Sequence, residues 1–267
     1  MLSNNPVPLS ITALAPGLVW WQVGLIVLLG AVVGLAIGQL SVTLERWEKL
    51  EPEELAERAE YESKRLEHEG VEADGTKMPP WEMETYGWTW LERWLAPIAT
   101  AVVFGLFALH QGVNLTLWLH LIWVAIMLQI VVFDLKHHLV LDWVTFPALL
   151  MALALSPITP WSSFDMSAQG AIVCGVLFLL LYVLGNVLFH GGMGFGDVKL
   201  AVLIGAVAGF DFTQLRWGAL DAIFYGVVLG GATVLLLMAL RIRGLKDVVA
   251  YAPFLCVGAT LVLYQNL

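Results

Sequence analysis

Two stretches of this sequence place carboxylates beside strongly apolar segments. Asp134 closes one apolar segment and is followed eight residues later by Asp142, and Asp197 stands just before another. A carboxylate is costly in a bilayer, so an acid in such a position is a functional candidate. Two acids at matching depth suggest one shared site. Because like charges at short range cannot both ionise cheaply, such a pair keeps a proton between them. It then offers an acid and a base at once, which suffices to hydrolyse an amide.

Glycines surround the second acid. Gly191, Gly192, Gly194 and Gly196 precede Asp197 within six residues. Glycine lets backbones approach closely and adopt angles that other residues avoid. Irregular backbone at membrane depth is tolerated only where protein or a water-filled cavity covers it. This stretch therefore predicts a solvated cleft with room for an extended peptide.

Structural roles compete with the catalytic one for some of these residues. Asp142 is well placed to cap the N-terminus of a following helix, and Asp197 could do the same for its own. Asp134 has no such role, because negative charge at a helix C-terminus opposes the helix dipole. Lys199 is two positions from Asp197, so on a helix the two side chains point to different sides. We interpret Lys199 as a cytoplasmic anchor of its helix rather than as a catalytic contact.

The composition is that of a membrane protein. Of the 267 residues, 59% are apolar and 13% are charged, whereas a soluble domain carries about a quarter charged residues. Apolar runs of roughly 17 to 25 residues, long enough to cross a bilayer, recur along the chain. The sequence predicts an all-α polytopic membrane protein with about eight transmembrane helices and one cytoplasmic loop domain. The spans are expected near residues 18–40, 94–111, 115–134, 143–159, 168–190, 198–212, 217–240 and 250–266.

The basic residues predict the orientation. With eight spans, every Lys and Arg outside the long 41–93 loop, except Arg216, falls on the same side as that loop. An excess of Lys and Arg marks the cytoplasmic side. Both chain ends are then expected outside, and Asp134, Asp142 and Asp197 at the cytoplasmic face.

The 41–93 loop is strongly acidic. It holds fifteen of the 22 acids and seven of the 13 Lys and Arg of the chain, which leaves it eight charges negative. Glu45 and Lys49 illustrate its acid–base pairs four residues apart, which are favoured on helix surfaces. Residues 44–70 are therefore expected to form a solvated helix, and the alternative is an acidic surface that attracts basic peptides. His137 and His138 are expected to face an aqueous connector.

Both acidic stretches resemble motifs of the type 4 prepilin peptidases, which are polytopic aspartic proteases of the Gly-x-Gly-Asp class. That family has two aspartates eight residues apart, the second usually within Leu-Pro-Asp, and Leu141 stands here where proline is usual. Its second motif, Gly-x-Gly-x-Gly-Asp-x-Lys-Leu, is matched in full by residues 192–200. Segments 144–147 and 252–259 also resemble the family, so the resemblance covers roughly 94–267.

The resemblance implies a role for each motif residue. It implies that Asp134 and Asp197 are the catalytic aspartates. It places supporting residues at Asp142, Gly192, Gly194, Gly196 and Lys199. It implies no cofactor for proteolysis, and no metal site is assigned.

The family commonly has two Cys-x-x-Cys pairs in its first cytoplasmic loop, which bind zinc and accompany N-methylation of the newly exposed N-terminus. The 41–93 loop contains no cysteine. The two cysteines of the chain, Cys174 and Cys256, lie within predicted spans and are expected to pack as small hydrophobes. We therefore expect cleavage without zinc and without methylation.

Together with the predicted spans and orientation, the resemblance implies a multi-pass endopeptidase of the bacterial inner membrane whose active site faces the cytoplasm. Residues 1–40 would form the outer N-terminus and first span, 41–93 the acidic cytoplasmic loop, and 94–267 the peptidase domain. Its expected partners are the bilayer and prepilins or pseudopilins, whose basic leader precedes an apolar helix. Nucleic acid is not expected, because no basic stripe is present. The alternatives are a proton-coupled transporter and a non-catalytic assembly factor for pili or secretion.

Overall fold

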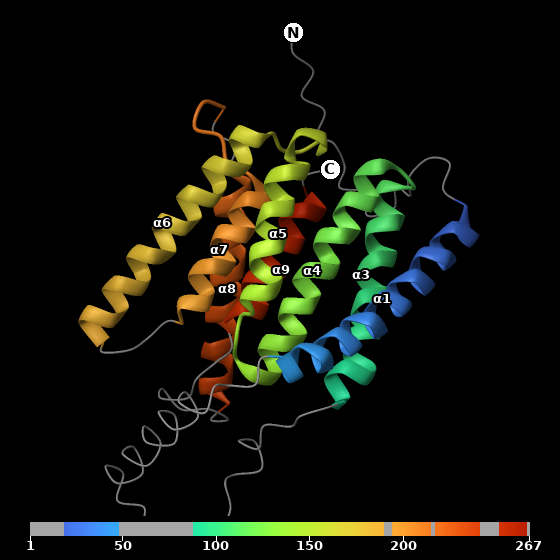
Figure 1. The fold of residues 1–267 in the computed structure, drawn as a ribbon, viewed down its shortest axis with the longest axis horizontal. Helices are drawn as coiled ribbons and strands as arrows, with labels where there is room; N and C mark the ends of the chain where they lie inside the picture. Colours follow the sequence, from blue (N-terminus) through green and yellow to red (C-terminus); the bar gives the residue numbers. More distant parts are fainter. Residues whose placement is uncertain (1–18, 48–87, 190–193, 215–216, 241–250, 266–267) are drawn as a thin grey trace, which may run out of the picture.

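The computed structural model describes residues 19–47, 88–189, 194–214, 217–240 and 251–265. Over these residues the protein is all-α (Figure 1). The elements are α1 (Trp20–Trp47), the π-helix η1 (Leu91–Leu95), α3 (Ala96–Gln111), α4 (Leu115–His137), α5 (Asp142–Leu155), the 3-10 turn η2 (Ser156–Ile158), α6 (Phe164–Phe189), α7 (Phe195–Ala208), α8 (Gly218–Ala239) and α9 (Ala252–Gln265).

Each of the eight predicted spans corresponds to one of these α-helices. Within the described ranges, five helical segments are long and apolar enough to cross a membrane: α1, η1 with α3, α4, α6 and α8. Helices α5 and α9 are apolar but shorter, and α7 has 14 residues. The prediction of an all-α, polytopic membrane protein is confirmed.

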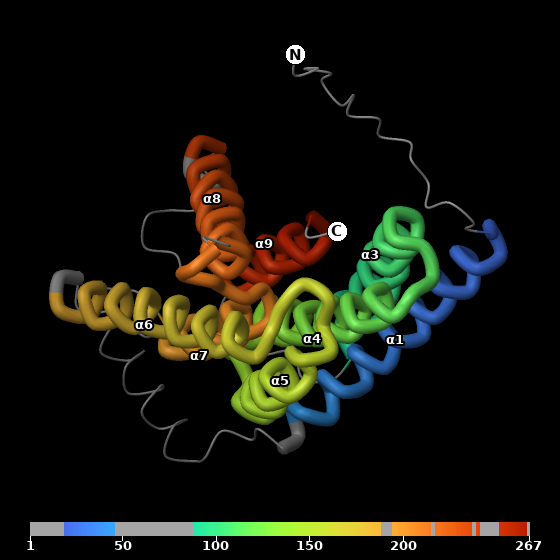
Figure 2. The backbone as a smooth tube through the Cα atoms, turned by 90° about the horizontal axis from the view of Figure 1, so that it is seen from above, coloured from blue at the N-terminus to red at the C-terminus, as the bar shows by residue number. Residues whose placement is uncertain are grey.

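Helix α4 lies between two groups of helices (Figures 1 and 2). On one side it contacts α1 and α3, and on the other it contacts α5 and α9, which in turn packs against α7 and α8. Helices α1 and α4 run down to the lower end of Figure 1, and α5 and α7 start from there. The end of α4 and the start of α7, which carry the two predicted catalytic acids, therefore lie at the same end of the bundle.

Glycines allow three helix pairs to pack backbone against backbone. A Cβ atom on Gly34 of α1 would lie 2.4 Å from the backbone of α3. Gly170 of α6 and Gly205 of α7 face each other, and a Cβ on either would lie 2.1 or 2.2 Å from the carbonyl oxygen of the other. Gly258 of α9 approaches the backbone of α8 in the same way. Small residues at helix contacts are the usual means of association in a bilayer, where apolar burial drives little.

Candidate active site

Asp134 lies in the last turn of α4, and only 4% of the residue is exposed. The helix ends where His138 adopts the left-handed conformation, with φ of 52°. The backbone N–H of His138 donates a hydrogen bond of 2.8 Å to the carbonyl oxygen of Asp134. This closed turn fixes the backbone from which the carboxylate projects. Because a negative charge here opposes the helix dipole, helix stability does not explain the acid.

Asp197 lies in the first turn of α7 and is half-buried. Gly194 is the N-cap residue of this helix, and the N–H of Asp197 donates a bond of 3.2 Å to its carbonyl oxygen. The alternative role of Asp197 as an N-cap is therefore wrong, because the residue stands inside the helix. A carboxylate in the first turn is nevertheless favoured by the helix dipole.

The start of α9 lies beside both acids. The backbone N–H of Ala252, its first residue, donates a hydrogen bond to the Asp134 carboxylate, and the charge of Asp197 acts on the same carboxylate. The thiol of Cys256, one turn along α9, interacts electrostatically with both acids. Among the described residues, Oδ2 of Asp134 has no hydrogen-bond partner. The two predicted catalytic carboxylates are thus within electrostatic reach of each other, and one buried oxygen atom is left without a partner.

Such a carboxylate pair has a defined chemical capacity. Repulsion between two negative charges is large where water is scarce, so the pair keeps one proton more readily than it ionises twice. The positive end of the α9 dipole favours negative charge on Asp134. A carboxylate and a carboxylic acid held together can activate a water molecule and protonate a carbonyl oxygen.

Asp142 and Lys199 form an ion pair with each other. The Lys199 ammonium lies 2.5 Å from Oδ1 of Asp142 and 5.2 Å from the centre of the Phe195 ring. The Asp142 side chain is 50% exposed. Leu141 is the N-cap residue of α5 and Asp142 is the first residue inside the helix, so the alternative role of Asp142 as an N-cap is also wrong. The pair links the start of α5 to the first turns of α7.

The glycines before Asp197 differ in their surroundings. A Cβ atom on Gly196 would lie 3.1 Å from the Cβ atom of Val140, in the connector between α4 and α5. Gly194 has φ of −71° and ψ of 144°, which any residue can adopt, and a Cβ atom there would meet nothing closer than 4.0 Å. Gly192 lies outside the described residues. The close approach of Val140 explains why position 196 is a glycine. Packing does not explain the glycine at position 194.

An apolar groove of about 380 Å³ shares one residue of its wall, Cys256, with the surroundings of the acids. It lies between α3, α4 and α9. Val131 of α4, one turn before Asp134, also lines it. The groove extends along α9 to Tyr264, which is two turns beyond Cys256. Its lining suits an apolar segment that leads away from the acids.

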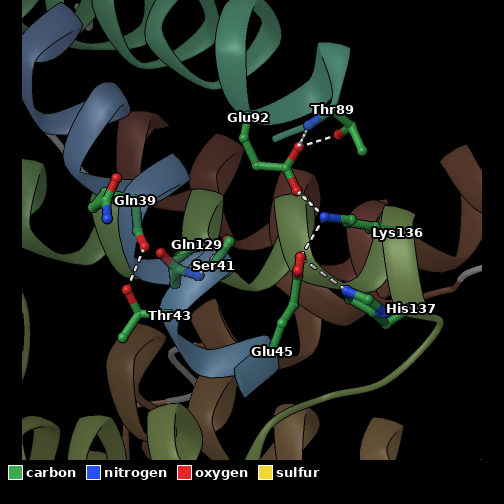
Figure 3. A network of polar contacts seen from close by, with 9 residues as sticks. All are labelled: Gln39, Ser41, Thr43, Glu45, Thr89, Glu92, Gln129, Lys136 and His137. Carbon is green, nitrogen blue, oxygen red and sulfur yellow. Dashed lines mark hydrogen bonds and ion pairs between the residues drawn. The ribbon is translucent and has the colours of Figure 1, made fainter. Parts of the chain in front are cut away.

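A buried polar network next to Asp134 was not predicted (Figure 3). Lys136 forms ion pairs with Glu45 and Glu92, and Nε2 of His137 lies 3.2 Å from Oε1 of Glu45. The expectation that His137 faces an aqueous connector is wrong, because only 13% of its side chain is exposed. Glu45 is likewise buried rather than on a solvated helix face. Its predicted partner Lys49 and most of the 41–93 loop lie outside the described residues.

Neither cysteine nor any acidic cluster forms a metal site in the part of the chain that the structure describes. Cys174 and Cys256 are buried and free. No group of three or more His, Cys, Asp or Glu residues among the described residues is arranged to hold a metal ion.

The comparison with known proteins finds a family match over the segment that carries Asp134 and Asp197. Residues 120–240 match the model of the type IV leader peptidase family. Two curated relatives are named prepilin leader peptidase/N-methyltransferase. The Bacillus subtilis protein is 27% identical over 172 residues, which cover 62% of this chain and 63% of the relative. The Pseudomonas aeruginosa protein is 26% identical over 176 residues, which cover 63% of this chain and 57% of the relative.

This chain therefore matches less than two thirds of the length of either relative. No solved structure matches it. The family match contains Asp134, Asp142 and Asp197 together with the glycines between the last two. Through residues 120–240, the chain is similar to the type IV leader peptidase family.

Proposed function

We propose that this chain is an aspartic endopeptidase of the bacterial inner membrane that removes the basic leader of prepilin-like proteins at the cytoplasmic face. The observation that carries the proposal is the approach of Asp134 and Asp197 at the start of α9, within the segment that matches the leader peptidase family. Both curated relatives carry names of prepilin leader peptidases, which supports the choice of substrate. Residues 94–267 would form the peptidase domain, preceded by the first span (1–40) and the acidic loop (41–93).

The proposed reaction uses the shared proton of the two acids. The ionised carboxylate takes a proton from a water molecule, and the resulting hydroxide attacks the carbonyl carbon of the scissile peptide bond. The protonated acid gives its proton to the carbonyl oxygen, which forms a neutral tetrahedral intermediate. The first acid then returns a proton to the leaving nitrogen as the carbon–nitrogen bond breaks, and the second acid takes a proton from one hydroxyl of the intermediate, which leaves a carboxylic acid and restores the shared proton. Asp142 and Lys199 would act as supporting residues by joining the starts of α5 and α7.

The apolar groove offers a place for the part of the substrate that follows the scissile bond. In prepilin-like proteins an apolar helix follows the leader, as the family resemblance implies. Cys256, which interacts electrostatically with both acids, is part of the groove wall, and the groove runs along α9 to Tyr264. A substrate helix in this groove would place its cytoplasmic end at the carboxylates. The basic leader would then lie on the side of the acidic 41–93 loop.

Amide substitutions of the two acids test the proposal. Asn has nearly the shape of Asp but cannot share or relay a proton. We expect Asp134→Asn and Asp197→Asn each to abolish cleavage of a prepilin-like protein by the purified enzyme, while membrane insertion is unchanged. Asp221→Asn is the matched control, because Asp221 is an exposed acid in the first turn of α8 and should leave cleavage unaltered.

Near-normal cleavage by either site variant would contradict the catalytic assignment. Wild-type protein that cleaves no member of a panel of pilins, secretion pseudopilins and competence pilins would instead favour an assembly factor or a transporter. Cleavage by the wild type that depends on both acids excludes these two alternatives as the main activity.

A further inference from the structure

A buried ion-pair network surrounds Lys136, two residues beyond Asp134 (Figure 3). The Lys136 ammonium pairs with Oε1 of Glu45 and, at 2.9 Å, with Oε1 of Glu92. The side chains of Lys136 and Glu45 are 2% exposed, and that of Glu92 is fully buried. The second oxygen of Glu92 accepts a bond of 2.9 Å from the N–H of Thr89. Charges buried to this extent persist only where they are paired, so the lysine and the two glutamates depend on one another.

The network joins three helical elements at one point. Glu45 lies near the end of α1, Glu92 in η1 and Lys136 in the last turn of α4. Apolar contacts also join these elements: Leu44 of α1 packs with Phe133 of α4, and Ile37 of α1 packs with Val132 of α4. Apolar contacts have no preferred direction, whereas a buried charge pair can specify one register between two elements. The ion pairs are therefore suited to setting the rotation of the last turn of α4.

Lys136 and Asp134 project from opposite faces of that turn. Successive residues of an α-helix are rotated by about 100°, so side chains two positions apart differ by about 200°. Lys136 contacts α1 and η1, while Asp134 contacts the start of α9 and is acted on by Asp197. The hydrogen bond from His138 to the carbonyl oxygen of Asp134 closes the same turn. A rotation that released Lys136 would thus move Asp134.

We propose that Lys136 is a positioning residue whose ion pairs with Glu45 and Glu92 hold the last turn of α4 in the orientation that places Asp134 beside Asp197. The same contacts connect both ends of the 41–93 loop to the helix that carries the proposed catalytic acid. The inference rests on the proposed function, because positioning matters only if Asp134 acts in the reaction.

Variants of the full-length protein in lipid test this role through the cleavage of a prepilin-like protein with a basic leader. Lys136→Met keeps the apolar stem and removes the charge. We expect it to lower kcat at least about tenfold, because small displacements of a reacting group are costly. KM should stay within about twofold, because substrate contacts are unchanged. Lys136→Arg should recover most of the lost kcat, because a guanidinium can pair with both carboxylates.

A triple variant separates positioning from charge balance. Lys136→Met removes the cation that two buried carboxylates share, which threatens folding. Lys136→Met with Glu45→Gln and Glu92→Gln leaves none of these charges, so it should insert and fold, yet its kcat should stay at least about tenfold low. Wild-type kcat in the triple variant would overturn the proposal, since the network would then only balance charge. An unchanged kcat in Lys136→Met would overturn it as well.

A second contact between the same helices provides a matched control. The Gln129 side chain of α4 donates a bond of 2.8 Å to the hydroxyl of Ser41 in α1, two turns away from Lys136. Ser41→Ala should keep kcat within about twofold, because this contact does not hold the last turn. A loss as large as that of Lys136→Met would show that any polar contact between α1 and α4 has the same effect, and would contradict a specific role for Lys136.

Amide hydrogen exchange distinguishes this inference from the proposed function. In the Lys136 variants, the amides of residues 134–138 should exchange faster than in the wild type, while those of α3 should not change. If the wild type cleaves no prepilin-like protein but the Lys136 variants show the expected faster exchange, the proposed function is contradicted and the structural role of Lys136 stands. If the wild type is active and the Lys136 variants have wild-type exchange and wild-type kcat, only the positioning role is contradicted.

Discussion

At the scale of single residues, the two glycines before Asp197 have different physical requirements. Gly196 lies against Val140, where a Cβ atom would come within 3.1 Å of the valine Cβ atom, and it directly precedes Asp197. Gly194 has an ordinary conformation and open space around its Cα atom. The sequence motif presents them as equivalent, but only Gly196 brings the start of α7 close to the connector that follows Asp134.

This difference predicts unequal effects of alanine. Gly196→Ala should push Val140 and the start of α7 apart by a few tenths of an ångström and lower kcat by about tenfold, because the distance between the two acids changes. Gly194→Ala should stay within about twofold of the wild type. The kcat values of the two purified variants, measured on one substrate, check this. A Gly194→Ala enzyme as impaired as Gly196→Ala would point to substrate contact at Gly194 rather than packing.

At the scale of helical elements, α6 supports the helix that carries Asp197. Gly170 of α6 faces Gly205 of α7 so closely that a Cβ atom on Gly170 would lie 2.1 Å from the Gly205 carbonyl oxygen. Backbone cannot yield as a flexible side chain can, so the two helices must separate if either glycine gains a side chain. The site therefore depends on a helix pair whose contact lies well away from the carboxylates along α7.

Two alanine variants of α6 test this dependence. Gly170→Ala should lower the midpoint of thermal unfolding and the cleavage rate together, because overpacking of a tight contact costs typically about 1–3 kcal/mol. Gly185→Ala is the control on the same helix, since a Cβ atom there meets nothing within 4 Å. It should leave stability unchanged or raise it slightly, because alanine is the better helix former. Equal unfolding temperatures for the two variants would refute the contact as a determinant of stability.

At the scale of the whole molecule, charge is concentrated in the 41–93 loop. This loop carries eight of the nine net negative charges of the chain. Such a field attracts basic segments and raises their rate of encounter. The leaders of prepilin-like proteins are basic, as the family resemblance implies, so the loop stays a candidate docking surface.

Neutralising several glutamates between residues 51 and 69 tests this docking role. Exposed charges more than about 10 Å apart are screened at 0.1 M salt. The variant should therefore raise the apparent KM most at low salt, with kcat preserved. The steady-state KM over a series of salt concentrations is the measurement. A KM equal to that of the wild type at every salt concentration would leave the loop a structural role only.

The same loop leads to a prediction about cofactors. A structural zinc site needs about four Cys or His ligands. Residues 41–93 contain no cysteine and a single histidine, His68. Cleavage should therefore survive a strong chelator, and mass spectrometry of the mature substrate should show an unmodified N-terminal amine. Transfer of a methyl group from S-adenosylmethionine by the purified protein would contradict this prediction.

Local features of the sequence were sufficient to predict the all-α membrane fold, and they also place Asp134 and Asp197 at helix ends, while their catalytic role stays a prediction. Apolar runs determine where helices form, because a bilayer requires every backbone polar group to be satisfied within its own segment. The position of Asp134 and Asp197 at the ends of such runs is equally local, and the fold brings the two acids within electrostatic reach of each other. The predicted N-cap roles of Asp142 and Asp197 were wrong, because helix boundaries shift by one or two residues with the surrounding contacts.

Only the tertiary structure decided which charged side chains form ion pairs. Lys136 and Glu45 are 91 positions apart, and nothing in the local pattern of either distinguishes a buried ion pair from a solvated helix face. Asp142 and Lys199, 57 positions apart, are a second such pair. Their pairing depends on how closely the helices approach, which the facing glycines and the apolar contacts set over the whole bundle. The sequence alone thus determined the elements and the acids they carry, while the packing of the helices determined how the last turn of α4 is held.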